Sequence, residues 1–301
     1  MKRWTLFAFI AGLALAVSGV RASTPPTVVI DFHSGAILSG NGAFSTAWVA
    51  DTSLEWWDNN STDPKLSVPA PHTTLNIGGV LAGGETTSGS GFSPTKLATP
   101  PGVIPFLHDS VAGVSIAVTD WVFQDGPSVG VLKLEFAGRR DINEFGIYKA
   151  GDPNTKKILF AGTVNPNTPS ATASFSPLAD LGSPQFGIYL KSGNLIFYSE
   201  SRFNSYVGTK PGWWDDDTEK GYQHFALFKG GLNPYGFVRW WIGVEDKGYG
   251  ENISESEASE GYKLRGDYQD LVLTMEVVPD ASTLALFLSG LPALALLRRR
   301  K

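Results

Sequence analysis

The sequence predicts an all-β protein, a β-sandwich with jelly-roll-like connections. Three observations favour this fold. Short segments alternate large apolar with polar side chains, as strands with one buried face do. Glycine (34 residues) and proline (19 residues) are frequent and supply the turn signals between these segments. The mature chain shows no convincing helical period, and many short strands separated by turns are typical of sandwiches.

The N-terminus has the three parts of a secretory signal peptide. Residues 1–3 are basic after the initial Met, residues 4–17 are apolar, and Val20, Arg21 and Ala22 stand where signal peptidase reads the chain. The apolar run is shorter than the ~20 residues that a spanning helix needs, which favours cleavage over a permanent membrane anchor. We therefore expect a signal peptide over residues 1–22 and export through the inner membrane.

The period-two pattern places strands along the mature chain. Residues 114–118 and 132–136 show it most clearly, and Lys-Ser-Gly-Asn at residues 191–194 is typical of a hairpin turn. Residues 56–105 are rich in Pro, Gly, Ser and Thr, which indicates hidden short strands or a functional excursion. The expected strands cover residues 28–32, 43–50, 74–77, 80–81, 114–118, 132–136, 144–148, 157–161, 185–190, 195–199, 224–229, 236–244 and 271–277.

The length and composition fit one domain of this class. A chain of 301 residues, 42% of them hydrophobic, is long enough for a sizeable core. We expect a single β-sandwich domain over residues 23–277; two smaller domains divided near residues 125–127 are the alternative. No internal repeat is evident. The net charge of −5, with basic residues scattered except at the two ends, excludes a nucleic-acid partner. The absence of cysteine excludes disulfides, thiolate metal sites and cysteine nucleophiles.

The C-terminus also has three parts. Val278, Pro279 and Asp280 open a short motif, an apolar run covers residues 284–297, and three arginines and a lysine end the chain. This pattern is typical of a single transmembrane helix with a cytoplasmic end rather than of an amphiphilic helix packed on the domain. The tail over residues 278–301 resembles the PEP-CTERM sorting signal of Gram-negative bacteria, with Asp280 and Ala281 in place of the usual Glu and Pro. The resemblance implies recognition by an exosortase, transient membrane anchoring and delivery to the cell surface or extracellular matrix.

A second set of motifs lies within residues 131–277. Segments reading Glu-Phe-Gly-Ile-Tyr, Phe-Gly-Ile-Tyr-Leu, Phe-Tyr-Ser and His-Phe-Ala-Leu-Phe precede two acidic motifs. The first acidic motif is Glu245 and Asp246, and the second reads Gly-Asp-Tyr-Gln-Asp-Leu-Val. Together these motifs resemble a domain of unknown function near the C-termini of exosortase-sorted surface proteins, in which Leu is usual at Lys247 and Asn at Gln269. The resemblance implies a β-sandwich with a role at the cell surface.

Four carboxylates are expected to meet where two strands end. Glu245 and Asp246 follow one apolar strand, and Asp267 and Asp270 precede the next. Hard cations bind several carboxylate, carbonyl and water oxygens, whereas clustered carboxylates without a cation repel one another. We therefore predict a metal site at these four residues with calcium as the cofactor. The alternative is that the aspartates only form turns, because the calcium-loop pattern of alternating acids is missing.

Tryptophans suggest a second kind of site. Six of the nine form adjacent pairs, at residues 56–57, 213–214 and 240–241. Neighbouring strand residues point to opposite faces, so one indole of each pair can pack in the core while the other is exposed and suited to stacking on a sugar ring. We expect carbohydrate contact through Trp56, Trp57, Trp213 or Trp214, with core packing as the alternative. Three aspartates at residues 215–217 form either part of an ion site or a solvated turn.

Motifs for catalysis are absent from the sequence. There is no His-Glu-x-x-His, no Gly-x-Ser-x-Gly and no phosphate-binding glycine-rich loop, and the histidines show no ligand spacing: His33, His72, His108 and His224. A glycosidase needs only two suitably placed carboxylates, for which Glu200 is the candidate. A surface charge at a strand end explains Glu200 more simply. We therefore expect no enzymatic activity.

These observations predict an exported, non-enzymatic protein of the cell surface or extracellular matrix, associated with biofilm or exopolysaccharide and stabilised by calcium. Its expected partners are signal peptidase, an exosortase, the membrane before processing, and exopolysaccharide. A carbohydrate-binding module or lectin-like adhesin is the first alternative. A polysaccharide hydrolase is the second.

Overall fold

Two β-sheets form most of the structured protein. The computed structural model describes residues 27–40, 77, 102–103, 120–126, 129–137, 143–162, 172–206, 223–246, 248, 268 and 270–279. These residues are mostly β-strands, with little helix. The predicted all-β class is therefore confirmed, and the two sheets enclose a shared core as in a sandwich.

Sheet A contains eight strands. They are β1 (Val28–Asp31), β2 (Ile37–Ser39), β4 (Trp121–Gln124), β6 (Asn143–Lys149), β7 (Asp152–Ala161), β9 (Gln185–Ser192), β10 (Leu195–Tyr198) and β11 (Ser205–Tyr206). Their order is β11-β10-β9-β4-β1-β2, and β9 also pairs with β6, which pairs with β7. The β1–β4 pair is parallel, whereas the other pairs are antiparallel.

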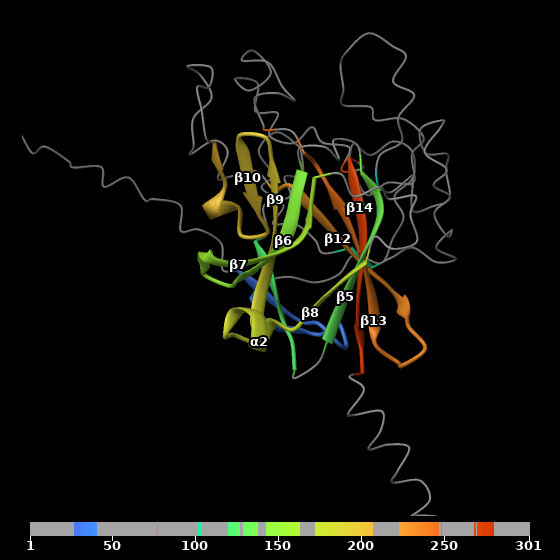
Figure 1. Cartoon of the computed structure of the whole chain (residues 1–301). Helices are drawn as coiled ribbons and strands as arrows, with labels where there is room; N and C mark the ends of the chain where they lie inside the picture. The colour runs from blue at the N-terminus through green and yellow to red at the C-terminus, as the bar shows by residue number, and fades with distance from the viewer. Residues whose placement is uncertain are drawn as a thin grey trace, which may run out of the picture.

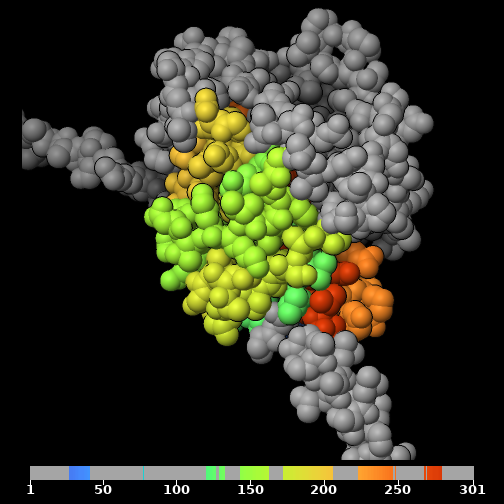
Figure 2. Space-filling view, in the orientation of Figure 1, coloured from blue at the N-terminus to red at the C-terminus, as the bar shows by residue number. Residues whose placement is uncertain are grey.

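Sheet B contains six strands, all paired antiparallel. They are β3 (Gly102–Val103), β5 (Val129–Ala137), β8 (Thr172–Phe175), β12 (Phe225–Leu232), β13 (Val238–Val244) and β14 (Leu271–Val278), in the order β3-β12-β13-β14-β5-β8. Figure 1 shows β6, β7, β9 and β10 on the left and β5, β12, β13 and β14 on the right. In Figure 2, β6 and β7 (light green) form part of the outer surface, and β14 (red) lies at the lower right next to β13 (orange).

Most predicted strands that fall on described residues are confirmed, and the 191–194 connection is a hairpin turn in which Ser192 pairs with Leu195. Within residues 74–77 only Ile77 is described, and it is helical, so the predicted strand is wrong at this residue. A short apolar run does not by itself distinguish a strand from a helix. The predicted strands at 43–50, 80–81 and 114–118 lie outside the described residues. Not predicted were β2, β3, β4, β8 and β11, each two to four residues long, and the helix α2 (Pro177–Leu181).

Aromatic side chains fill the space between the sheets. The Phe123 ring of β4 lies with its centroid 5.0 Å from the Phe32 ring and 5.0 Å from the Trp240 ring of β13. Trp240 is fully buried, and its Nε1 donates a hydrogen bond to the Phe32 carbonyl oxygen at 2.9 Å. Trp241 is also buried, with the side chain packed over Gly230. Both indoles of the 240–241 pair are therefore buried, as the core-packing alternative predicts.

The turn after β1 ties the two sheets together at one end. Besides Phe32, two further carbonyl oxygens of this turn accept hydrogen bonds from sheet B. Val238 N donates to His33 O at 2.8 Å, and Lys229 Nζ donates to Gly35 O at 3.3 Å. Turn residues thus supply the acceptors that fix the sheets relative to each other.

The two predicted terminal segments fall mostly outside the described residues. The signal peptide at residues 1–22 is outside the described residues. In the tail, Val278 ends β14 and Pro279 follows it, whereas Asp280 and the apolar run are outside the described residues. Among the residues that the structure describes, none forms a helix long and apolar enough to cross a membrane.

Candidate metal site

Strand pairing brings three of the four predicted carboxylates to one place. β13 and β14 are antiparallel neighbours, with Gly243 opposite Val272. Glu245 and Asp246 directly follow β13, and Asp270 directly precedes β14, so all three emerge at the same end of sheet B. The fourth predicted ligand, Asp267, lies outside the described residues.

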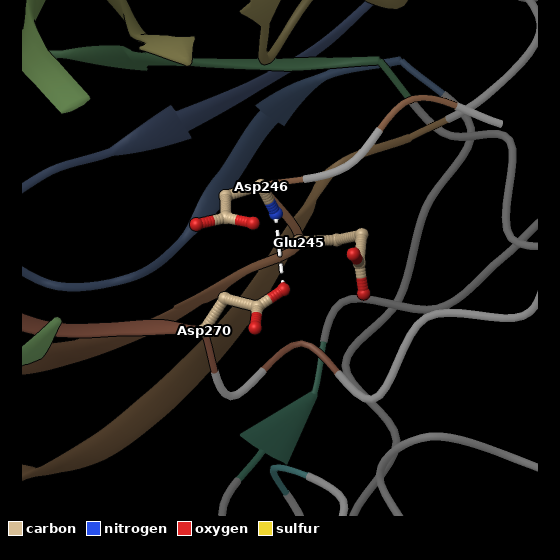
Figure 3. A group of neighbouring side chains, drawn as sticks. All are labelled: Glu245, Asp246 and Asp270. Atoms are coloured by element: carbon tan, nitrogen blue, oxygen red, sulfur yellow. Dashed lines mark hydrogen bonds between the residues drawn. The ribbon is translucent and has the colours of Figure 1, made fainter. Parts of the chain in front are cut away.

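The three side chains form a compact group of oxygen atoms. One carboxylate oxygen from each of Glu245, Asp246 and Asp270 lies within 4.8 Å of the other two. The Asp246 backbone N–H donates to Asp270 Oδ2 at 3.2 Å, and Figure 3 shows the Asp270 carboxylate pointing toward the backbone of the other two residues. Glu245 is 3% exposed and Asp246 is 1% exposed, while Asp270 is half-buried.

This arrangement is electrostatically costly without a positive charge. Like charges at such separations repel one another, and burial weakens the solvation that would otherwise stabilise each carboxylate. Hard cations prefer such a set of carboxylate oxygens. The group could therefore hold a metal ion.

Two neighbouring side chains, those of His224 and Tyr268, fix the backbone around the carboxylates. His224 Nδ1 lies 2.9 Å from the Glu245 carbonyl oxygen, and its ring stacks on Phe197 with centroids 3.5 Å apart. Tyr268 is buried, has the positive φ of 54° that is unusual for a side chain of its size, and donates from Oη to the Gln223 carbonyl oxygen at 2.6 Å. These contacts hold the chain in position on both sides of the acidic group. Sequence reasoning missed Tyr268, although it lies inside the second acidic motif.

A fourth polar side chain reaches the group from sheet A. Asn143 is the first residue of β6, and its Nδ2 donates to Asp246 Oδ2 at 3.2 Å. The side chain is buried. The sequence carried no signal for this contact, because Asn143 precedes Asp246 by 103 positions and sits in a different sheet.

The structure does not test the carbohydrate prediction. Trp56, Trp57, Trp213 and Trp214 lie outside the described residues, as do the three aspartates at 215–217. Trp240 and Trp241, which complete the adjacent pairs, are both buried.

Glu200 is not the surface charge that the sequence suggested. It is 2% exposed, and it accepts hydrogen bonds from Tyr148 Oη at 3.0 Å and from the Gly151 backbone N–H at 2.8 Å. Arg202 forms an ion pair with its other oxygen. Burial, and then the charge of Glu200, raise the pKa of Tyr148 well above its usual value, so the phenol remains a donor. The expectation failed because Tyr148 and the turn between β6 and β7 lie against this strand end.

Comparison of the chain with models of protein families, with curated proteins and with solved structures gives no match.

Proposed function

We propose that this protein is an exported, non-enzymatic component of the bacterial cell surface or extracellular matrix, and that calcium stabilises its jelly-roll-like β-sandwich. The observation that carries the proposal is the convergence of Glu245, Asp246 and Asp270 within 4.8 Å at one end of sheet B. Export and surface sorting are supported by the sequence, through the signal-like first 22 residues and the PEP-CTERM-like tail.

Calcium fits the chemistry of the group better than a softer metal does. All three side chains offer carboxylate oxygens, which calcium binds in sets of six to eight together with carbonyls and water. The chain has no cysteine to offer a thiolate. The nearby His224 directs Nδ1 at the Glu245 carbonyl oxygen rather than at the carboxylates. Calcium is also plentiful outside the cell, where the proposal places the protein.

The bound ion would act as a clasp. It would join the end of β13 to the start of β14, which is the last strand before the tail. β14 ends at Val278, directly before Pro279. Closing this strand pair would complete the folded domain and leave the tail accessible to the sortase.

Elemental analysis of the full chain, purified in mild detergent without chelator, tests the proposal. We expect about one calcium per chain. Asp270→Asn should lose this calcium, because it removes one of the three charges. Glu276→Gln is the matched control. Glu276 lies on β14, the strand that Asp270 precedes, and its carboxylate forms an ion pair with Arg239. A wild-type protein free of calcium, or equal calcium in the wild type and Asp270→Asn, would contradict the proposal.

A further inference from the structure

The geometry points to Asn143 as a neutral ligand of the cation site, contributed by sheet A to a group that sheet B provides. This inference rests on the proposed calcium site and adds a ligand to it. Asn143 is 8% exposed. Its Nδ2 donates to Asp246 Oδ2 at 3.2 Å, so its carboxamide already reaches the carboxylates.

The oxygen of the same carboxamide has no protein partner. Asn143 Oδ1 is buried and accepts no hydrogen bond from any residue that the structure describes. Buried polar atoms in native proteins are almost always hydrogen-bonded, so such an atom requires an explanation. The carboxamide thus donates into the acidic group while its own acceptor is unused.

The hydroxyl oxygen of Ser192 is a second buried polar atom without a hydrogen-bond partner among the described residues. Ser192 lies directly opposite Asn143 in the β6–β9 pair, and opposite residues in an antiparallel pair point to the same face of the sheet. Ser192 is 3% exposed, and its Oγ also has no hydrogen-bond partner within the described part of the chain. Two neighbouring buried oxygens therefore lie beside a group of carboxylates. A protein donor does not account for either of them, whereas a cation accounts for the first.

Rotation of the carboxamide by half a turn exchanges Oδ1 with Nδ2 and explains the first of these atoms. Without a cation, Nδ2 faces Asp246 and donates to its carboxylate. With calcium bound, Oδ1 faces the group and binds the ion, as asparagine carbonyl oxygens do in other calcium sites. The Nδ2 then points away from Asp246.

This assignment gives the ion contacts with both sheets. Glu245, Asp246 and Asp270 adjoin the ends of strands in sheet B, and Asn143 is the first residue of β6 in sheet A. Calcium binding would therefore stabilise the packing of one sheet on the other, in addition to the pairing of β13 with β14. A neutral fourth ligand also keeps the charge of the site at three carboxylates, and the number of charged ligands tunes calcium affinity.

Isothermal titration of calcium chloride into the full chain in detergent tests this role. Asn143→Leu keeps the size of the side chain but removes the oxygen, and it should weaken calcium binding by about tenfold or more. Asn154→Leu is the matched control, because it makes the same change at an exposed position of β7 in the same sheet, and it should leave the affinity unchanged. Asn143→Asp should bind calcium more tightly, since it adds a fourth charged ligand. The ¹³C signal of the Asn143 carboxamide carbonyl, assigned by its loss in Asn143→Leu, should shift on addition of calcium.

The outcomes separate this inference from the calcium site itself. If Asn143→Leu binds within twofold of the wild type while Asp270→Asn abolishes binding, Asn143 is not a ligand and the calcium site stands. If the wild type binds no calcium, both proposals fail. Should Asn143→Leu not fold, Asn143→Asp decides the matter, because an affinity equal to or weaker than that of the wild type would overturn the ligand role.

Discussion

The ring of Tyr148 on β6 lies against the backbone of Gly187 on β9. The two residues face each other in the antiparallel register, and a Cβ atom on Gly187 would come within 2.4 Å of the Tyr148 ring. Gly146 and Tyr189 repeat this relationship with the strands exchanged, since a Cβ atom on Gly146 would come within 2.6 Å of the Tyr189 ring.

The cause is a tetrapeptide that occurs twice. Phe-Gly-Ile-Tyr covers residues 145–148 and residues 186–189, and the two copies pair antiparallel so that each glycine faces the tyrosine of the other copy. The Phe and Ile of both copies point into the core between the sheets, whereas the tyrosines form a separate cluster with Tyr198. Glycine supplies the space that each ring occupies.

Gly187→Ala should therefore destabilise the protein by about 1–3 kcal/mol, the usual cost of overpacking. The Tyr148 ring cannot easily move away, because its Oη donates to Glu200 and accepts from the Glu200 backbone N–H at 3.1 Å. Gly231→Ala on β12 is the control, since a Cβ atom there would meet no atom within 4 Å. Urea unfolding measures both variants. Equal unfolding midpoints for the two would show that the ring does not need the glycine.

The pair of His33 and Asp125 should make stability depend on pH. His33 Nε2 lies 2.6 Å from Asp125 Oδ1. This hydrogen bond is the largest cause that raises the pKa of His33 above its ordinary value, with smaller contributions from the charges of Asp125 and Asp31. Because the folded-state pKa is raised, the stabilisation is fully present below about pH 6.5 and is lost as the pH rises through the folded-state pKa.

His33→Gln measures that contribution. The variant should lose about 1 kcal/mol relative to the wild type at pH 6, and the difference should shrink by pH 9. Ser34→Ala is the control, because it removes the hydrogen bond from Ser34 Oγ to Asp31 in the same turn and no group that titrates in this range. A difference between wild type and His33→Gln that is the same at both pH values would contradict the account.

The Asp120 carboxyl group should make the folded protein more stable as the pH falls. Burial is the largest cause that raises the pKa of Asp120, and the hydrogen bonds from Ser201 oppose this shift. Asp120 Oδ1 accepts from Ser201 N at 2.8 Å and from Ser201 Oγ at 2.6 Å, while Oδ2 is buried and has no partner among the described residues. For an acid with a raised folded-state pKa, the contribution is present at low pH and is lost as the pH rises through that value.

Asp120→Asn keeps the acceptor for Ser201 and removes the titration. The stability of the wild type minus that of Asp120→Asn should therefore increase as the pH falls from 7.5 toward the ordinary aspartate pKa of about 3.9, as measured by chemical unfolding. Asp120→Ala provides the contrast, because it also removes both hydrogen bonds from Ser201 and should cost about 1–3 kcal/mol throughout this range. A constant difference between wild type and Asp120→Asn would mean that the carboxyl group does not titrate there.

The sorting tail makes a prediction about location. Deletion of residues 284–301 removes the apolar run and the four terminal cations. The truncated protein should be released from the cells or change its location, because the resemblance assigns anchoring and sortase recognition to this segment. Cell fractionation with an antibody measures the distribution. Unaltered surface retention would count against the sorting assignment.

The sequence predicted those parts of the structure that depend on residues close together in the chain. β13 and β14 have strong apolar patterns, and the acids at their adjoining ends follow from antiparallel pairing. The contacts of Asn143 with Asp246 and of Tyr148 with Glu200 depend on which strands become neighbours. That choice is made by the topology of the whole sheet and leaves no local pattern. Strands such as β2 and β4 are too short to show a period.

A cation bound at Glu245, Asp246 and Asp270 should stabilise the sandwich, and thermal unfolding of the full chain measures this stabilisation. With calcium at about 100 times its Kd, the Tm of the wild type should lie about 5–10 °C above its value in chelator. The Tm of Asp270→Asn should respond little to calcium. In chelator, the Tm of this variant should be higher than that of the wild type, because one repelling charge is gone. A wild-type Tm that is the same in calcium and in chelator would contradict the claim.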